Sequence, residues 1–123
     1  MVTEFWIEKA WGESINNALI TDAYNALIEL INVDDEHGFI WIGHVDEEYV
    51  LEIQKDLQLF LIFGENQDKR LKMSILDWDK VVLLIRSYFD KDFGVLKNEF
   101  TMNLLDNIRE IYNINKINNF SLN

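Results

Sequence analysis

His37 and His44 are the only histidines of the chain, and the acids Asp34, Asp35 and Glu36 directly precede the first of them. Imidazole and carboxylate groups ligate transition metals, so this cluster invites a metal-site hypothesis. However, the residues before His44 are typical of a β-strand, in which side chains seven positions apart point to opposite faces and lie roughly 23 Å apart. We therefore expect no metal site here. The chain has no cysteine, which excludes disulfides, thiol catalysis and cysteine-ligated metals.

Two short motifs resemble fragments of known functional sequences. Asp92-Phe93-Gly94 spells a protein-kinase metal motif, but the glycine-rich loop and catalytic loop of kinases are missing. A calcium loop starting at Asp90 would have its glycine and its glutamate, Glu99, at the wrong positions. Serine-hydrolase, phosphate-binding-loop and zinc-protease motifs are also missing, and the acids fall in predicted loops rather than a cleft. We expect a protein that is not an enzyme and has no cofactor.

The elements that position these residues follow from hydrophobic periodicity. Four short segments rich in β-branched and aromatic residues predict an antiparallel meander over 38–44, 49–54, 57–63 and 70–75, and 5–7 predicts a preceding strand. Helices are predicted over 22–32, with Thr21 as N-cap, over 78–89, and around 100–112. The predicted fold is α+β, an antiparallel β-meander of about four or five strands packed with two or three α-helices.

The chain is expected to form a single domain over residues 1–123, because it contains no proline, no linker composition and no repeat. The Asn-rich tail 113–123 is the part expected to fray, with Ile114, Ile117 and Phe120 as the residues able to hold it. The N-terminus lacks the features of a signal peptide and no apolar run reaches the length of a membrane span, so we expect a cytoplasmic, globular protein.

The strand patterns also predict how the sheet is covered. In 49–54, Glu52 and Gln54 share one face, which is the wetter one, while the strands 39–42 and 57–63 are apolar on both faces. This asymmetry predicts helices that partly cover both faces, or a groove. Trp41 and Trp78 are expected in the core.

The net charge of −11 is the strongest functional signal. Residues 29–56 contain nine acids against Lys55 alone, a net charge of −8. This charge opposes nucleic acid phosphates and anionic lipids, so neither is an expected partner. It favours a basic protein partner or serves solubility.

Strand alternation sorts the acids between the two ends of the meander, because each antiparallel reversal changes ends. End A, where the strand 38–44 begins, gathers six acids: Asp34, Asp35, Glu36, Asp56, Asp77 and Asp79. The opposite end, end B, receives Asp46, Glu47 and Glu48. These nine acids are the candidate partner-binding residues.

Helix dipoles distinguish the acids of end A. Asp77 is expected to cap the helix 78–89, and Asp79 lies in its favourable first turn. Asp34 and Asp35 directly follow the C-terminus of the helix 22–32, where negative charge is unfavourable. They therefore have no expected structural role, and selection by a partner is the favoured explanation for them, with a solvated loop as the alternative.

The aromatic run Gly38-Phe39-Ile40-Trp41-Ile42-Gly43, the hairpin after it and the helix start Leu76-Asp77-Trp78-Asp79 occur here in a small, acidic, cysteine-free α+β protein. In this style the chain resembles bacterial immunity proteins of contact-dependent growth inhibition and related polymorphic toxin systems. The resemblance covers roughly residues 20–95 and carries over no family residue. It implies tight binding to a basic toxin domain, often a nuclease, whose active site or substrate path is blocked.

Three hypotheses follow for the function. The first is an antitoxin whose carboxylates mimic the phosphates that the toxin binds. The second is an acidic adaptor or regulatory domain that binds a protein without neutralising a toxin. The third is a small enzyme that uses carboxylates in a groove.

Overall fold

The structure is a computed structural model that describes the backbone of residues 2–121 and the side chains of residues 2–113. Its centre is a six-stranded antiparallel sheet with strand order β2-β1-β3-β4-β5-β6. The strands are β1 (Phe5–Lys9), β2 (Ile15–Asn16), β3 (Phe39–His44), β4 (Val50–Gln54), β5 (Gln58–Phe63) and β6 (Lys69–Ser74). The predicted meander and the preceding strand are confirmed, and the two-residue edge strand β2 was not expected.

Three helices complete the α+β fold: α1 (Ile20–Ile31), α2 (Trp78–Phe89) and α3 (Phe93–Ser121). The bounds of α2 agree with the prediction, and Asp77 caps it by accepting a hydrogen bond from the Lys80 N–H at 3.1 Å. Thr21 as the N-cap of α1 is wrong. The helix begins two residues earlier, at Ile20, because the Asp22 carboxylate accepts the Leu19 N–H at 2.8 Å and so holds the chain at the first turn.

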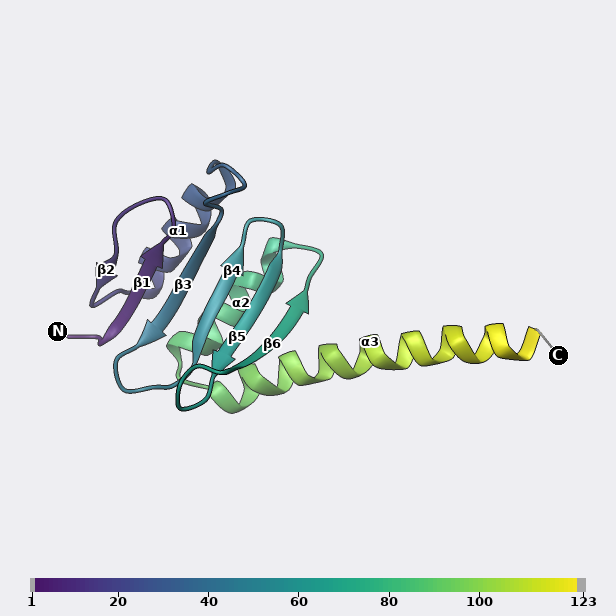
Figure 1. Cartoon of the computed structure of the whole chain (residues 1–123). Helices are drawn as coiled ribbons and strands as arrows, with labels where there is room; N and C mark the ends of the chain where they lie inside the picture. The colour runs from purple at the N-terminus through teal and green to yellow at the C-terminus, as the bar shows by residue number, and fades with distance from the viewer. Residues whose placement is uncertain (1, 122–123) are drawn as a thin grey trace.

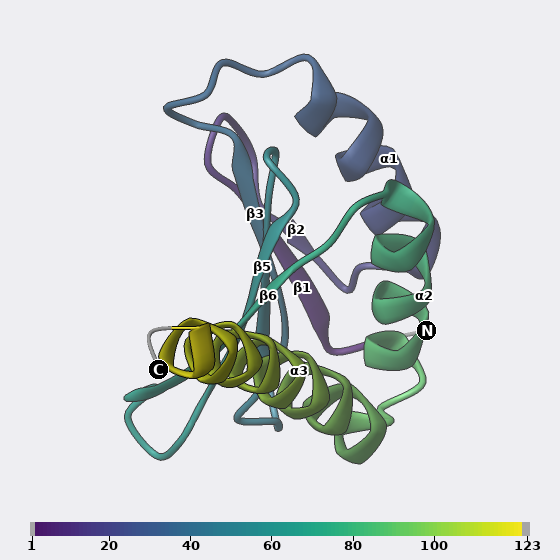
Figure 2. The same ribbon diagram turned by 90° about the vertical axis from the view of Figure 1, so that its right-hand side faces the viewer.

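The helices α1 and α2 lie side by side on one face of the sheet (Figure 2). The core between the layers contains alternate residues of each strand, among them Ile7, Ile42, Leu51 and Leu61, all fully buried. Tyr88 of α2 is also buried there, and burial raises the pKa of its hydroxyl well above its usual range.

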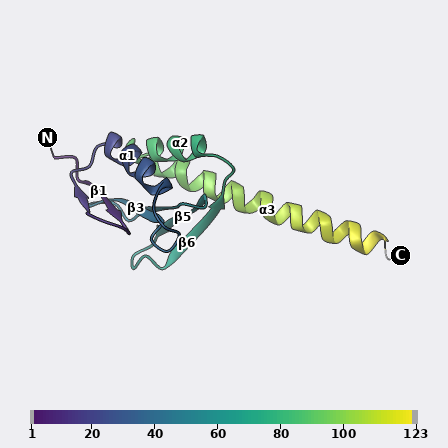
Figure 3. The same cartoon turned by 90° about the horizontal axis from the view of Figure 1, so that it is seen from above.

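The second face of the sheet carries no helix, so partial cover of both faces is wrong (Figures 2 and 3). The alternative, a groove, is present there as a pocket of about 350 Å³ whose lining includes Trp41 and Glu52. Trp41 lies on this open face half-buried rather than in the core, 5.1 Å from Phe39 between ring centroids. Glu52 on the neighbouring strand is only 6% exposed. Its carboxylate accepts the Trp41 indole N–H at 2.7 Å and the Gln54 amide at 2.9 Å, and lies 3.4 Å from the Arg70 guanidinium. Side-chain hydrogen bonds therefore replace a covering helix here.

The third helix leaves the body of the protein. Its first two turns pack on β6 and α2 through Phe93, Leu96 and Phe100, and the rest projects past the β6 edge (Figures 1 and 3). The backbone is helical through Ser121, while the side chains of Ile114, Ile117 and Phe120 lie outside the described residues. Among the described residues, no helix is both long and apolar enough to cross a membrane.

Candidate functional site

Three connections lie side by side at end A, at the top of Figure 1: residues 32–38 between α1 and β3, 55–57 between β4 and β5, and 75–77 between β6 and α2. Backbone hydrogen bonds join them. The Lys55 N–H donates to the Gly38 carbonyl at 2.7 Å, and the Ile75 N–H donates to the Leu57 carbonyl at 3.2 Å. End A is therefore one continuous surface and not three independent loops.

The structure divides the nine candidate acids between the two ends of the sheet. Six of them lie on or directly after the three connections of end A: Asp34, Asp35, Glu36, Asp56, Asp77 and Asp79. Asp46, Glu47 and Glu48 follow β3 at the opposite end. The β-meander thus separates them as strand alternation predicts, and a partner that contacts one group does not reach the other through the same surface.

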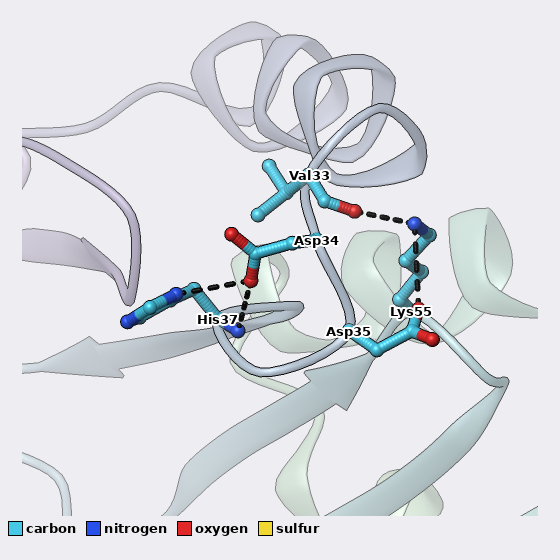
Figure 4. Close-up of polar contacts among 5 residues, drawn as sticks. All are labelled: Val33, Asp34, Asp35, His37 and Lys55. Atoms are coloured by element: carbon cyan, nitrogen blue, oxygen red, sulfur yellow. Dashed lines mark hydrogen bonds and ion pairs between the residues drawn. The ribbon is translucent and has the colours of Figure 1, made fainter.

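Asp34 has a local structural role that the sequence argument missed. Its Oδ1 accepts the His37 backbone N–H at 2.9 Å and lies 3.0 Å from His37 Nδ1 (Figure 4). This closes a short turn between α1 and β3. The backbone and ring hydrogen bonds of His37 lower the pKa of Asp34 below its ordinary value. The interpretation that Asp34 has no structural role is therefore wrong.

Lys55 offsets much of the expected repulsion at the C-terminus of α1. Its ammonium group donates to the Val33 carbonyl and lies 3.6 Å from the Asp35 carboxylate (Figure 4). A cation close to the last carbonyls of a helix stabilises it, which counteracts the acids that follow. The Asp35 side chain is nevertheless fully exposed, so its carboxylate stays available to another molecule.

The other acids of end A have few cations nearby. Asp56 accepts the Gln58 N–H at 3.2 Å, which holds the β4–β5 turn. Lys80 is engaged by Glu99 at 2.7 Å. Within the part of the chain that the structure describes, no ion pair involves Glu36, Asp56 or Asp79. End A therefore keeps a surplus of negative charge.

An apolar groove opens beside these acids and was not predicted. We call it the α1–α2 groove; it has a volume of about 380 Å³ and is lined by Tyr24, Leu27, Ile28, Ile31, Trp78 and Val82. Ile28 and Ile31 are 64% and 50% exposed. Trp78 is half-buried on its wall and not in the core, because α1 covers only part of its ring. The groove adjoins end A because α1 ends there and α2 begins there.

The sequence contained one signal for this groove. Leu27 and Ile28, and then Leu30 and Ile31, are consecutive apolar pairs in α1. A helix that packs on one surface needs only one stripe, so the second member of each pair points away from the sheet. Leu27 and Leu30 are indeed buried, whereas Ile28 and Ile31 are exposed.

End B brings two lysines and two aromatic side chains close to the sheet end. The ammonium groups of Lys69 and Lys97 lie over the Phe63 ring at the end of β5, at 6.0 Å and 4.7 Å from its centroid. Glu47 faces the buried Tyr88 and contributes to the raised pKa of its hydroxyl. Among the described residues, no ion pair involves Asp46, Glu47 or Glu48, so these acids are no better compensated than those of end A.

One further cluster at end B has metal-ligand chemistry. One ligand atom from each of Glu4, His44 and Asp46 lies within 4.8 Å of the others. However, His44 Nδ1 accepts the Asp46 backbone N–H at 3.1 Å, so neutral His44 carries its proton on Nε2, which lies 3.9 Å from Glu4. A metal at Nε2 would leave an imidazole without any proton. This cluster is better explained as a buried histidine held by two neighbours. His37 lies beyond the other end of β3, so the two histidines do not form a common site.

Comparison of the chain with protein-family models, with curated proteins and with solved structures finds no match.

Proposed function

We propose that this protein is an immunity protein that binds and neutralises a basic toxin domain, such as a nuclease, in the cytoplasm of the cell that makes it. The observation that supports this is the juxtaposition at end A of weakly compensated carboxylates with the exposed apolar α1–α2 groove. Acids that served only solubility would not need an apolar neighbour. Monomeric proteins seldom expose large apolar patches that have no binding partner.

The two parts of this surface have different roles in binding. The carboxylates of Asp35, Glu36 and Asp79 attract a cationic surface over a distance and accelerate association. Ile28 and Trp78 then bury apolar area against the partner, which slows dissociation. A nuclease binds the phosphates of its substrate with cationic side chains. The carboxylates of this protein would pair with those side chains and so block access of the substrate.

The experiment compares two variants with equal changes of charge. The end A variant is Asp35→Asn, Glu36→Gln and Asp79→Asn, and the end B variant is Asp46→Asn, Glu47→Gln and Glu48→Gln. A partner is first isolated by affinity capture from the native cell and identified by mass spectrometry. Association is then measured at about 50 and 500 mM salt, and the change should be several-fold for the native protein.

The end A variant should associate at least several-fold more slowly at low salt and protect cells poorly against the expressed partner. The end B variant should resemble the native protein in both assays. Equal loss in both variants would mean that only the net charge matters, and loss in the end B variant alone would place the interface at the other end. Thermal unfolding of both variants controls for folding.

The adaptor hypothesis predicts the same complex without neutralisation. The discriminating result is therefore growth: if the captured partner is not toxic when expressed alone, the adaptor is the better explanation. For the enzyme hypothesis, three acids of end A, Asp35, Glu36 and Asp56, line an open pocket of about 420 Å³ together with Lys55. A thermal-shift screen with divalent metals and small metabolites tests it.

A further inference from the structure

The far part of α3 carries an apolar face that the body of the protein does not cover. Phe93, Leu96 and Phe100 lie on the face of α3 that packs against the body. At 100° per residue, five large apolar residues beyond the edge of the sheet lie within an arc of about 120° that adjoins this packed face and turns away from it. We call these residues the α3 stripe: Leu104, Leu105, Ile108, Ile111 and Tyr112.

The α3 stripe is exposed in the single chain. Its side chains are between 39% (Leu105) and 62% (Tyr112) exposed. Together they present on the order of 500 Å² of largely apolar surface, at the upper range for patches on monomeric proteins. The acids of this segment, Asp106 and Glu110, lie on the opposite side of the helix. A projecting helix with this pattern gains little stability in water without a surface to cover its stripe.

The distribution of charge along the chain indicates which kind of partner covers the α3 stripe. Residues 1–100 carry the entire net charge of −11, whereas residues 101–123 contain Asp106 and Glu110 against Arg109 and Lys116 and are neutral. A basic partner attracted to the body therefore finds no charge complement on this helix. A second, equally acidic chain is repelled by the body and is not repelled by the helix.

We propose that the α3 stripe pairs with the α3 stripe of a second copy of this chain, with the two helices antiparallel. In that arrangement each stripe meets itself, as a two-fold interface requires. Pairing centred on Ile108 places the two bodies at opposite ends of the helix pair. Their separation along the axis is roughly 20 Å, beyond the Debye length of ~8 Å at physiological ionic strength. Two stripes together bury on the order of 1,000 Å², the lower limit for a specific interface.

Analytical ultracentrifugation of the full chain tests this proposal, because it needs no other partner and is independent of the proposed function. The native chain should be dimeric at tens of micromolar. Leu105→Glu with Ile108→Glu should weaken self-association at least tenfold. Met102→Glu with Asn113→Glu adds the same charge to the same helix outside the stripe and should leave the dimer intact. Thermal unfolding should be similar for all three at a concentration so low that the native chain is monomeric, since these positions lie outside the core.

The orientation is tested by single cysteines, which the native chain lacks. In the antiparallel pair Ile108→Cys lies beside its counterpart and should form a disulfide-linked dimer under mild oxidation. Tyr112→Cys lies ~12 Å from its counterpart along the axis, too far for a disulfide. A monomer at 200 µM, a dimer that survives the stripe variant, or equal dissociation of both glutamate variants would overturn the proposal. Equal crosslinking at positions 108 and 112 would overturn the antiparallel orientation.

Discussion

Gly43 offers a sharp test of how the open face of the sheet is built. It lies opposite Trp6 in the β1–β3 register, and the Trp6 indole lies across it. A Cβ added at Gly43 would lie 2.0 Å from Cζ2, 2.3 Å from Cε2 and 2.6 Å from Cη2 of that ring. We therefore expect Gly43→Ala to displace the Trp6 ring.

The size of the effect follows from these distances. A carbon–carbon contact needs about 3.5–4 Å, so the ring has to move by roughly 1.5–2 Å. Forcing an extra methyl group into a packed site costs typically ~1–3 kcal/mol. Replacing glycine in a strand returns roughly 0.5–1 kcal/mol, because alanine loses less conformational freedom on folding. The net loss of unfolding free energy should be about 1–2 kcal/mol.

The assay is urea denaturation in a double-mutant cycle. In a Trp6→Ala background the clash is gone, so Gly43→Ala should be neutral or stabilise by about 0.5 kcal/mol. Gly12→Ala is the matched control, since a Cβ there meets no atom within 4 Å, and it should change stability little. The same loss in both backgrounds, or no loss in the native background, would refute this account of the open face.

Three other changes test the remaining features. Glu52→Ala removes the acceptor of the Trp41 indole and of Gln54, and should lower the unfolding free energy in urea by about 1–3 kcal/mol. Trp78→Ala should cost about 1–2 kcal/mol in guanidinium denaturation, less than the 3–5 kcal/mol typical of a fully buried tryptophan, because its ring is only partly buried on the wall of the α1–α2 groove. Asp34 has a lowered pKa when folded, so its ionised form stabilises the native state above its ordinary pKa of 3.8, and this contribution is lost as the pH falls. Between about pH 5 and pH 3 the native protein should therefore lose more stability than Asp34→Asn, as measured by thermal unfolding at each pH; a parallel loss would remove Asp34 from the explanation.

The part of the fold set by local periodicity could be predicted from the sequence. The residues Trp78, Val81, Val82 and Ile85 recur at helical spacing, and α2 has the predicted bounds. The separation of the acids between end A and end B could also be predicted, because consecutive antiparallel strands alternate in direction. Such inferences need only the order of the elements along the chain.

The features that depend on contacts between distant segments were not predictable in this way. The sequence pattern cannot show that Lys55 reaches back to the Val33 carbonyl, or that Asp34 closes a turn onto His37. Likewise, apolar residues on both faces of β3 suggested helices on both sides. The structure instead covers part of the second face with Trp41 and the other side chains that bind Glu52. These few contacts produce no periodic pattern of residue types that could be recognised in the sequence.

The two proposed surfaces occupy different ends of the molecule. The helix α2 begins at end A and ends at the connection to α3, so its length separates the acidic surface from the α3 stripe. Pairing through α3 would leave the end A surfaces of both copies accessible. Binding of a basic partner and self-association are therefore expected to be independent: the Leu105→Glu and Ile108→Glu variant should keep the native association rate with the partner, whereas the end A variant should keep the native dimer. Neither variant is expected to change the result of the other assay. A variant that weakened both partner binding and self-association would therefore show that the two surfaces are coupled.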